Sequence, residues 1–169
     1  MNDKQFKKIV WLIFLTGLAL RSVWVYLVPL WQQAVEYPHF YYIQHIYKYK
    51  ELPVSKAEFP DYEGFQPPMY YLLASGIYSL SPNLDTQREQ RGNEVVLDWR
   101  SQQFQNKNGM ARILRWLSVA LWMGTFWVSY QFLKRLFQDK KEIILLSLSL
   151  LAFLPTYLSN SSAITNDGL

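Results

Sequence analysis

The chain has 169 residues, of which half are apolar, with a net charge of +4 and no cysteine. Its mean hydropathy is only -0.08, yet most aliphatic residues fall into three runs of about twenty, the length that a helix needs to cross a bilayer. This distribution excludes an ordinary soluble domain, and the lack of cysteine excludes a disulfide framework, a thiolate nucleophile and a zinc finger. The basic residues flank the apolar runs, which favours membrane topology over nucleic-acid binding.

Three membrane-spanning helices are predicted, over residues 9–30, 113–133 and 143–163. The first run follows three lysines and is too long for a cleavable signal sequence. Basic residues also fill the short connection at 134–141. By the positive-inside rule both basic flanks are cytoplasmic, so we expect a multi-pass cell-membrane protein with a cytoplasmic N-terminus and an extracytoplasmic loop over residues 31–111.

Two helices that begin near prolines are predicted within this loop. Pro38 is suited to the first turn of a helix, and residues 39–50 carry an apolar stripe at helical spacing. The stripe consists of Phe40, Ile43, Ile46 and Tyr47. A Pro-Pro pair introduces a second apolar helix over 69–80, which is too short to span a bilayer. We expect both helices to lie on the membrane surface, and a short helical piece is predicted over 95–104.

Two residues within the apolar runs carry expectations of their own. Pro155 interrupts the third run, and we expect a kink there if neighbouring helices satisfy the carbonyl group that the proline frees. Arg21 lies about two turns below the outer end of the first run. We expect its side chain to extend along the helix towards the interface.

Three groups outside the membrane could carry chemistry. Glu36 could act as a general base or bind a cation, but an acid beside a helix N-terminus is also favoured by the helix dipole alone. His39 follows three residues later, and Glu-x-x-His is half a metal site at best, whereas His45 falls on a different part of the helix. The alternative for His39 is a lone interfacial histidine. Asp167 is either a functional ionisable group at the outer end of the third run or an acid that lies in water beyond the lipid.

Arg112 and Arg115 occupy the outer, N-terminal end of the second run. Both the helix dipole and the positive-inside bias disfavour cations there. An anion nearby would offset this, and it is either a lipid head group or a substrate phosphate held by the guanidinium groups. Tyrosines crowd the two loop helices, where aromatic faces suit sugar rings and isoprenoid chains or, equally, the bilayer interface. These tyrosines are Tyr41, Tyr42, Tyr47, Tyr70 and Tyr71.

Four short segments follow one another in an informative order. They are Glu36-Tyr37-Pro38-His39-Phe40, Glu51-Leu52-Pro53-Val54, Gln66-Pro67-Pro68-Met69-Tyr70-Tyr71-Leu72-Leu73 and Ile164-Thr165-Asn166-Asp167. Their order resembles the N-terminal part of polytopic glycosyltransferases of the GT-C superfamily, especially relatives of the dolichyl-phosphate-mannose protein mannosyltransferases of glycosyltransferase family 39. The resemblance implies an all-α membrane enzyme that transfers a sugar from a polyprenyl-phosphate carrier to a protein, lipid or glycan hydroxyl on the outer face.

The resemblance also implies roles for individual residues. In that family an acidic pair supplies the catalytic base, and a later acid contributes to the metal or donor site. Glu36 matches the second member of the pair and Asp167 the later acid, so both are expected to be catalytic and to bind a divalent metal cation. The first member of the pair is Val35 here, a departure from the family pattern. The residues expected to bind substrate are His39, Gln66, Tyr70, Arg112 and Arg115.

In the expected mechanism a carboxylate removes the proton of the acceptor hydroxyl, while a divalent cation or Arg115 stabilises the departing phosphate. Full members of the family carry many more spans, so we expect this chain to be the N-terminal portion of a longer protein and inactive by itself. The rival interpretation is a non-catalytic membrane subunit or lipid-binding scaffold whose acids only cap helices. A transporter is less favoured, because transporter sites lie near the bilayer midplane.

Overall fold

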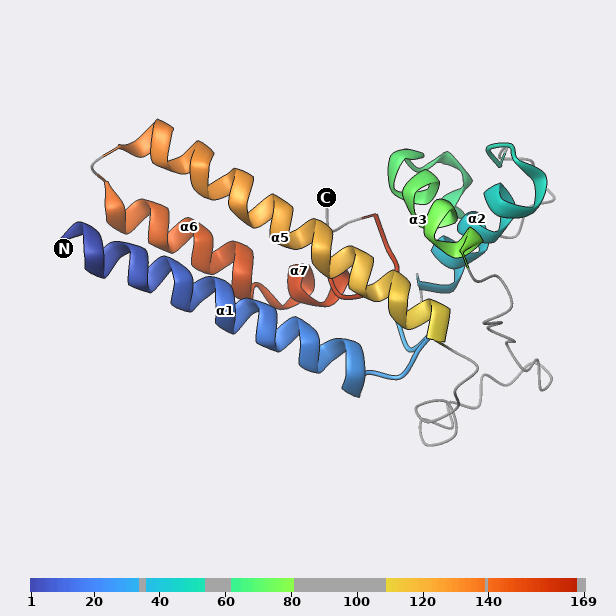
Figure 1. Ribbon diagram of the computed structural model, residues 1–169, viewed down its shortest axis with the longest axis horizontal. Helices are drawn as coiled ribbons and strands as arrows, with labels where there is room; N and C mark the ends of the chain where they lie inside the picture. Colours follow the sequence, from blue (N-terminus) through green and yellow to red (C-terminus); the bar gives the residue numbers. More distant parts are fainter. Residues whose placement is uncertain (34–35, 54–61, 81–108, 139, 167–169) are drawn as a thin grey trace.

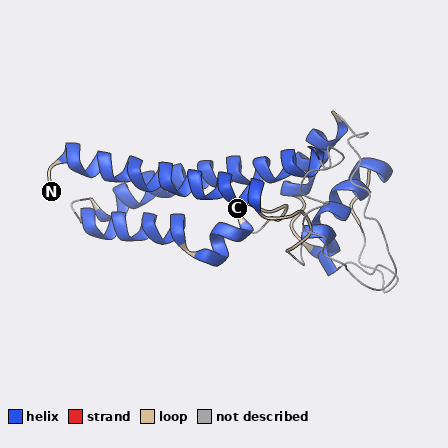
Figure 2. Cartoon of the chain, turned by 90° about the horizontal axis from the view of Figure 1, so that it is seen from below, coloured by secondary structure: helices blue, strands red, loops and turns tan. Residues whose placement is uncertain are grey.

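The computed structural model describes five stretches of the chain, residues 1–33, 36–53, 62–80, 109–138 and 140–166. Helices account for 80% of the described residues and strands for none of them, which confirms the all-α prediction for this part of the chain. The helices are α1 (Asp3–Leu27), α2 (Glu36–Tyr49), η1 (Tyr62–Phe65), α3 (Met69–Ser79), α5 (Gly109–Phe137), α6 (Lys141–Phe153) and α7 (Pro155–Asn160). Helices α1, α5 and α6 form an elongated bundle, and α2 and α3 lie at one end of it (Figures 1 and 2).

The three apolar runs that were predicted to span a membrane lie in helices of the bundle, with boundaries that differ from the prediction. α1 is the only helix of the described residues that is long and apolar enough to cross a membrane, and its 25 residues extend about 37 Å. α5 is longer, but polar residues such as Ser118, Thr125 and Ser129 interrupt its apolar sequence. α6 ends after 13 residues.

Close packing holds the bundle together around one glycine. Gly17 of α1 lies so near α5 and α6 that an added Cβ would meet Trp122 at 3.1 Å and Ala152 at 3.2 Å. About one turn before Gly17 on α1, the ring of Phe14 stacks on that of Trp122, with centroids 5.7 Å apart. The aromatic side chains therefore fill the space that the small residues leave between the helices.

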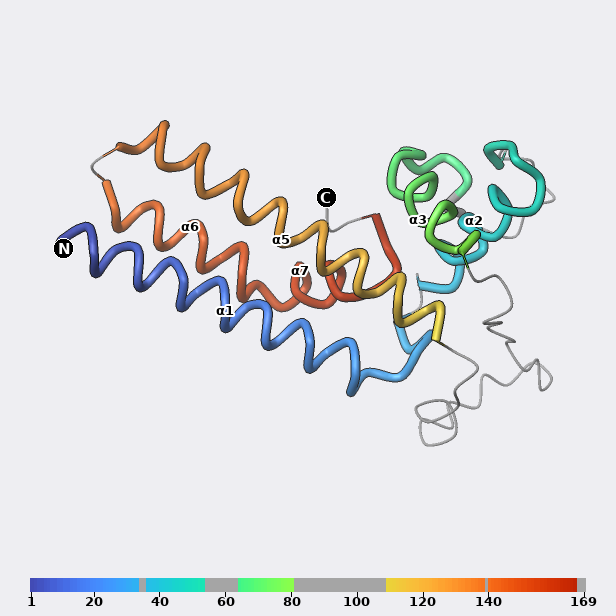
Figure 3. The backbone as a smooth tube through the Cα atoms, viewed as in Figure 1, coloured from blue at the N-terminus to red at the C-terminus, as the bar shows by residue number. Residues whose placement is uncertain are grey.

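The predicted kink at Pro155 is a complete break between α6 and α7 (Figure 3). Proline has no N–H group, so the carbonyl of Leu151, four residues earlier, loses its helical donor. Arg21 of α1 donates to this carbonyl at 3.4 Å and to that of Ala152 at 2.9 Å. Arg21 is fully buried, so the expectation that its side chain extends towards the interface is wrong. The neighbouring helix supplies the donor that a broken helix needs within a bundle.

The two predicted loop helices are present as α2 and α3, and the apolar stripe of α2 packs against α3. Phe40, Ile43 and Ile46 of its apolar stripe are buried in a core shared with α3. Tyr42 and Tyr71 stack there with centroids 3.8 Å apart. The stripe therefore forms the contact between the two helices, because α3 offers an apolar surface that sequence periodicity alone could not reveal. The predicted piece over 95–104 lies outside the described residues.

Candidate functional site

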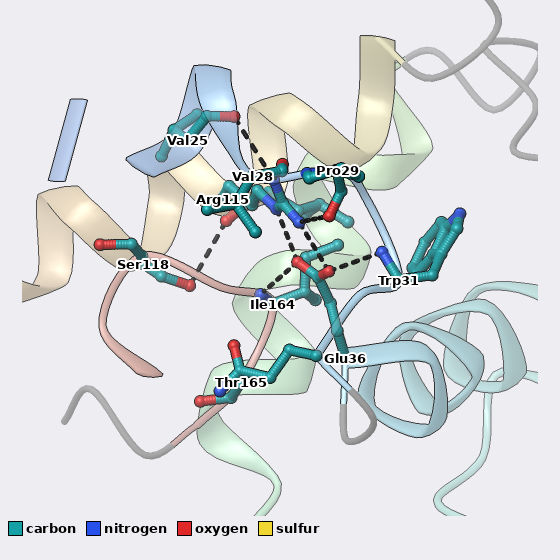
Figure 4. A network of polar contacts seen from close by, with 12 residues as sticks. Val25, Val28, Pro29, Trp31, Glu36, Arg115, Ser118, Ile164 and Thr165 are labelled. Atoms are coloured by element: carbon teal, nitrogen blue, oxygen red, sulfur yellow. Dashed lines mark hydrogen bonds and ion pairs between the residues drawn. The ribbon is translucent and has the colours of Figure 1, made fainter. Parts of the chain in front are cut away.

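A fully buried ion pair joins the bundle to the α2–α3 unit (Figure 4). Glu36 is the first residue of α2, and Arg115 lies in the second turn of α5. The Arg115 Nε donates to Glu36 Oε1 at 2.7 Å, and its Nη2 donates to Oε2 at 2.8 Å. This two-pronged geometry is the strongest hydrogen-bonding arrangement that a guanidinium and a carboxylate can form.

The carboxylate of Glu36 accepts two further hydrogen bonds from backbone N–H groups. Trp31 donates to Oε2 at 2.9 Å, and Ile164 donates to Oε1 at 3.1 Å. Each oxygen thus accepts two hydrogen bonds, which is the capacity of an ionised carboxylate. In this arrangement Glu36 has no lone pair left for a substrate proton or a metal ion. None of the donors belongs to α2, so Glu36 ties separate segments together and does not cap its own helix through these bonds.

Arg115 is equally occupied, because its remaining N–H groups cap the end of α1. They donate to the carbonyl of Val28 at 2.7 Å, to Pro29 at 3.0 Å and to Val25 at 3.4 Å. Pro29 cannot donate to the carbonyl of Val25, and a cation at a helix C-terminus is favoured by the dipole. With two bonds to Glu36 and three to carbonyls, all five guanidinium N–H groups are used. The anion expected beside Arg115 is the chain's own Glu36.

Side-chain amides form two further hydrogen bonds at the same junction. The Gln33 amide donates to Asn160 Oδ1 at 2.7 Å, and the Asn166 amide donates to Gln66 Oε1 at 3.1 Å. Residues 161–165 between these two asparagines are buried. The end of α1, the start of α2, the segment before α3 and the segment after α7 therefore meet at one place.

Two of the predicted substrate-binding residues are buried within the α2–α3 unit and its contact with α5. The Nδ1 atom of His39 lies 2.6 Å from the hydroxyl of Tyr71. Tyr70 shares a hydrogen bond of 3.1 Å with the hydroxyl of Ser118. Burial, and secondarily the negative charge of Glu36, raises the pKa of Tyr70 well above its ordinary value. Tyr70 is therefore a neutral phenol at physiological pH and a poor proton acceptor.

The structure brings five of the predicted site residues, Glu36, His39, Gln66, Tyr70 and Arg115, to this junction and the helices that form it. Arg112 is partly exposed on α5, about one turn before Arg115. Asp167 and Val35 lie outside the described residues.

The described residues gather no cluster of metal-ligating side chains. No group of three or more His, Cys, Asp or Glu side chains gathers among residues 1–33, 36–53, 62–80, 109–138 and 140–166. Glu36, the predicted ligand within these ranges, already has four N–H donors on its oxygens.

Sequence reasoning missed the amide ties and the direct pairing of Glu36 with Arg115. One signal pointed to the pairing: Arg115 is a cation in a place that both its helix and the membrane disfavour, so an anion was expected nearby. Nothing in the sequence marks the backbone N–H of Ile164 as a partner of Glu36, since 128 residues separate them. Comparison with known proteins does not help, because no protein-family description, no characterised protein and no solved structure matches this chain.

Proposed function

We propose that the chain belongs to a membrane glycosyltransferase of the GT-C type, which transfers a sugar from a polyprenyl-phosphate donor to an acceptor hydroxyl on the extracytoplasmic face. One observation carries the proposal. Three of the segments on which the resemblance rests, at Glu36, at Gln66 and at 164–166, converge at one end of the bundle. A shared site requires such convergence, whereas unrelated cap residues do not.

The surface of the bundle supports a membrane location with three crossings. Large apolar side chains are exposed on all three long helices, including Leu12 at 63%, Val128 at 67% and Leu146 at 63%. An apolar surface of this extent is unfavourable in water and neutral in lipid. The capping of the α6 carbonyls by Arg21 also suits a helix break at membrane depth, where water cannot satisfy them. The junction then lies on the outer side, and the N-terminus in the cytoplasm.

Within this proposal the buried pair has a positioning role. The carboxylate of Glu36 could accept a proton from a substrate only after giving up at least one of its four donors. The pair instead fixes the start of α2 against the end of α1 and against Ile164. Asp167, the other predicted catalytic acid, follows directly after Asn166, which is tied to Gln66.

The test uses the complete protein in lipid and a radiolabelled polyprenyl-phosphate sugar. We expect Glu36→Gln to abolish transfer while leaving membrane insertion intact, because Arg115 then stays buried without its counter-charge. We expect the double variant Glu36→Gln with Arg115→Gln to recover part of the transfer, since no uncompensated charge remains. A double variant as inactive as the single one would assign Glu36 to proton transfer, and unchanged turnover in Glu36→Gln would remove it from the mechanism.

A second candidate function is a non-catalytic membrane subunit or lipid-binding scaffold. The full occupation of both Glu36 and Arg115 favours it, because a saturated pair needs no substrate to explain its presence. The same assay separates the two candidates. Absence of transfer from any polyprenyl-phosphate sugar to any acceptor by the complete protein would favour the scaffold.

A further inference from the structure

The end of the bundle opposite the junction is strongly basic. The first turns of α1, the last turn of α5 and the start of α6 lie together there (Figure 1). Their cationic residues are Lys4, Lys7, Lys8, Lys134, Arg135, Lys140 and Lys141, which we call the basic collar. All are exposed except Lys141, which is partly buried. The described acids at this end are only Asp3 and Glu142.

Tertiary contacts hold the three segments of the basic collar at one level. Lys141 at the start of α6 donates to the carboxylate of Asp3 at 2.7 Å and to the carbonyl of Met1 at 3.2 Å. The hydrogen bond from Lys141, and then the charges of Lys141, Lys7 and Lys134, lower the pKa of Asp3. The carboxylate of Asp3 therefore interacts electrostatically with cations from α1, α5 and α6. The two described acids at this end cannot neutralise the seven cations of the basic collar.

Each of the three helices changes from basic to exposed and apolar at this level. On α1 the change falls between Lys8 and Trp11, which is 55% exposed, a rise of about 4.5 Å. On α5, Phe132 is exposed just before Lys134, and on α6 Leu146 is exposed just over one turn after Lys141. A Lys/Arg band bordering an apolar belt, with tryptophan at the border, is typical of the head-group level of a bilayer.

We propose that the basic collar binds the phosphodiester head groups of anionic phospholipids in the adjacent leaflet. The inference rests on the membrane location proposed above but not on glycosyl transfer. Lysines and arginines just outside a span attract anionic lipid, and each contributes independently near the surface. The band of cations beside an exposed apolar belt favours lipid over nucleic acid, because a phospholipid offers acyl chains to the belt as well as phosphates to the cations.

The test uses the full chain in nanodiscs of mixed phosphatidylcholine and phosphatidylglycerol. The lipids that stay bound after gentle extraction are measured by mass spectrometry. We expect enrichment of phosphatidylglycerol in the wild type, and a loss on the order of ten-fold in the double variant Lys7→Gln with Lys134→Gln. The matched control is Lys48→Gln with Lys50→Gln, two exposed lysines at the other end of the molecule, which should keep the wild-type enrichment.

A third variant gives an effect of opposite sign. Asp3→Asn removes the acid that occupies Lys141, so we expect a two- to three-fold rise in bound phosphatidylglycerol, on the order expected for one added charge. Loss of folding would not produce such a rise. Because the chain has no cysteine, Gln138→Cys gives a single labelling site that verifies topology in every variant. Wild-type enrichment in the Lys7 and Lys134 variant, or displacement of the lipid by inorganic phosphate, would overturn the proposal.

Discussion

Two buried arginines close two helix ends in which a proline has removed a hydrogen-bond donor, one inside the bundle and one at its junction with α2 and α3. Inside the bundle, Arg21 reaches the carbonyl of Leu151, which Pro155 leaves without a donor. At the junction, Arg115 reaches the carbonyl of Val25, which Pro29 leaves in the same state. In both places an arginine on another helix donates the hydrogen bond that the missing N–H group would have donated.

The two regions differ in how they compensate the charge. Arg115 pairs with Glu36, whereas no carboxylate of the described residues pairs with Arg21. The guanidinium of Arg21 lies instead 3.8 Å from the ring centroid of Trp122 and 5.8 Å from that of Tyr157. Carbonyl dipoles, aromatic faces and the Ser161 hydroxyl, which accepts from the Arg21 Nε at 2.9 Å, therefore hold this buried cation. The acid at the junction adds something else, because it binds the backbone of two further segments.

This difference predicts that removing Arg115 is the most damaging of these changes. Arg115→Met leaves Glu36 buried without a counter-charge, and we expect a loss of about 3–5 kcal/mol in the free energy of unfolding. Denaturant titration in detergent measures it. Adding Glu36→Gln should restore a substantial part of the loss, since the uncompensated charge is then gone. A loss below about 1 kcal/mol for the single variant would show that the pair is not the main tie at the junction.

Removing Arg21 should cost less, because it leaves carbonyls and no charge behind. For Arg21→Met we expect a loss of about 1–3 kcal/mol from the uncapped carbonyls of Leu151 and Ala152. In a Pro155→Ala background the same change should cost less, because the alanine N–H again serves Leu151. Equal costs in the two backgrounds would contradict the role of Arg21 as a substitute for the missing donor.

Packing beside Arg21 gives a third, smaller effect. Gly17→Ala places a Cβ within 3.2 Å of Trp122 and Ala152, and we expect a loss of about 1–2 kcal/mol in thermal unfolding experiments. The control is Gly124→Ala on α5, where nothing lies within 4 Å of the new Cβ. There the higher helix propensity of alanine should stabilise the protein by about 0.5–1 kcal/mol. Similar losses in both variants would mean that the close approach at Gly17 does not matter.

The ion pair of Asp3 and Lys141 lies at the surface of the protein, where water screens it. It should therefore have the smallest effect on stability. The pKa of Asp3 is lowered from 3.8 by Lys141, so its contribution to stability is present above about pH 4 and is lost as the pH falls through the lowered value. Unfolding experiments across the acid range should show this slope in the wild type and a weaker one in Lys141→Gln. A steep slope that survives in the variant would assign it to another carboxylate.

The local elements and the candidate residues followed from the sequence. Periodicity and proline positions predicted α2 and α3 to within a few residues at each end, and the proline at 155 predicted the break in the third apolar run. The same reasoning selected Arg115, because it is a cation in an unfavourable place, and Glu36, because it is an acid just outside the membrane at the start of a predicted helix. It could not show that they satisfy each other, since pairing across 79 residues depends on how helices pack.

What the sequence determined by itself is therefore the helical content and the residues that need a partner, because propensity, periodicity and burial cost act locally along the chain. The tertiary structure decided which group became the hydrogen-bond or packing partner of each of these residues. It turned the stripe of α2 towards α3, placed Arg21 on the carbonyls of α6, and gave Glu36 four donors from three segments outside α2. Buried polar groups must be satisfied, but many arrangements could satisfy them, and only the packing of the helices selects one.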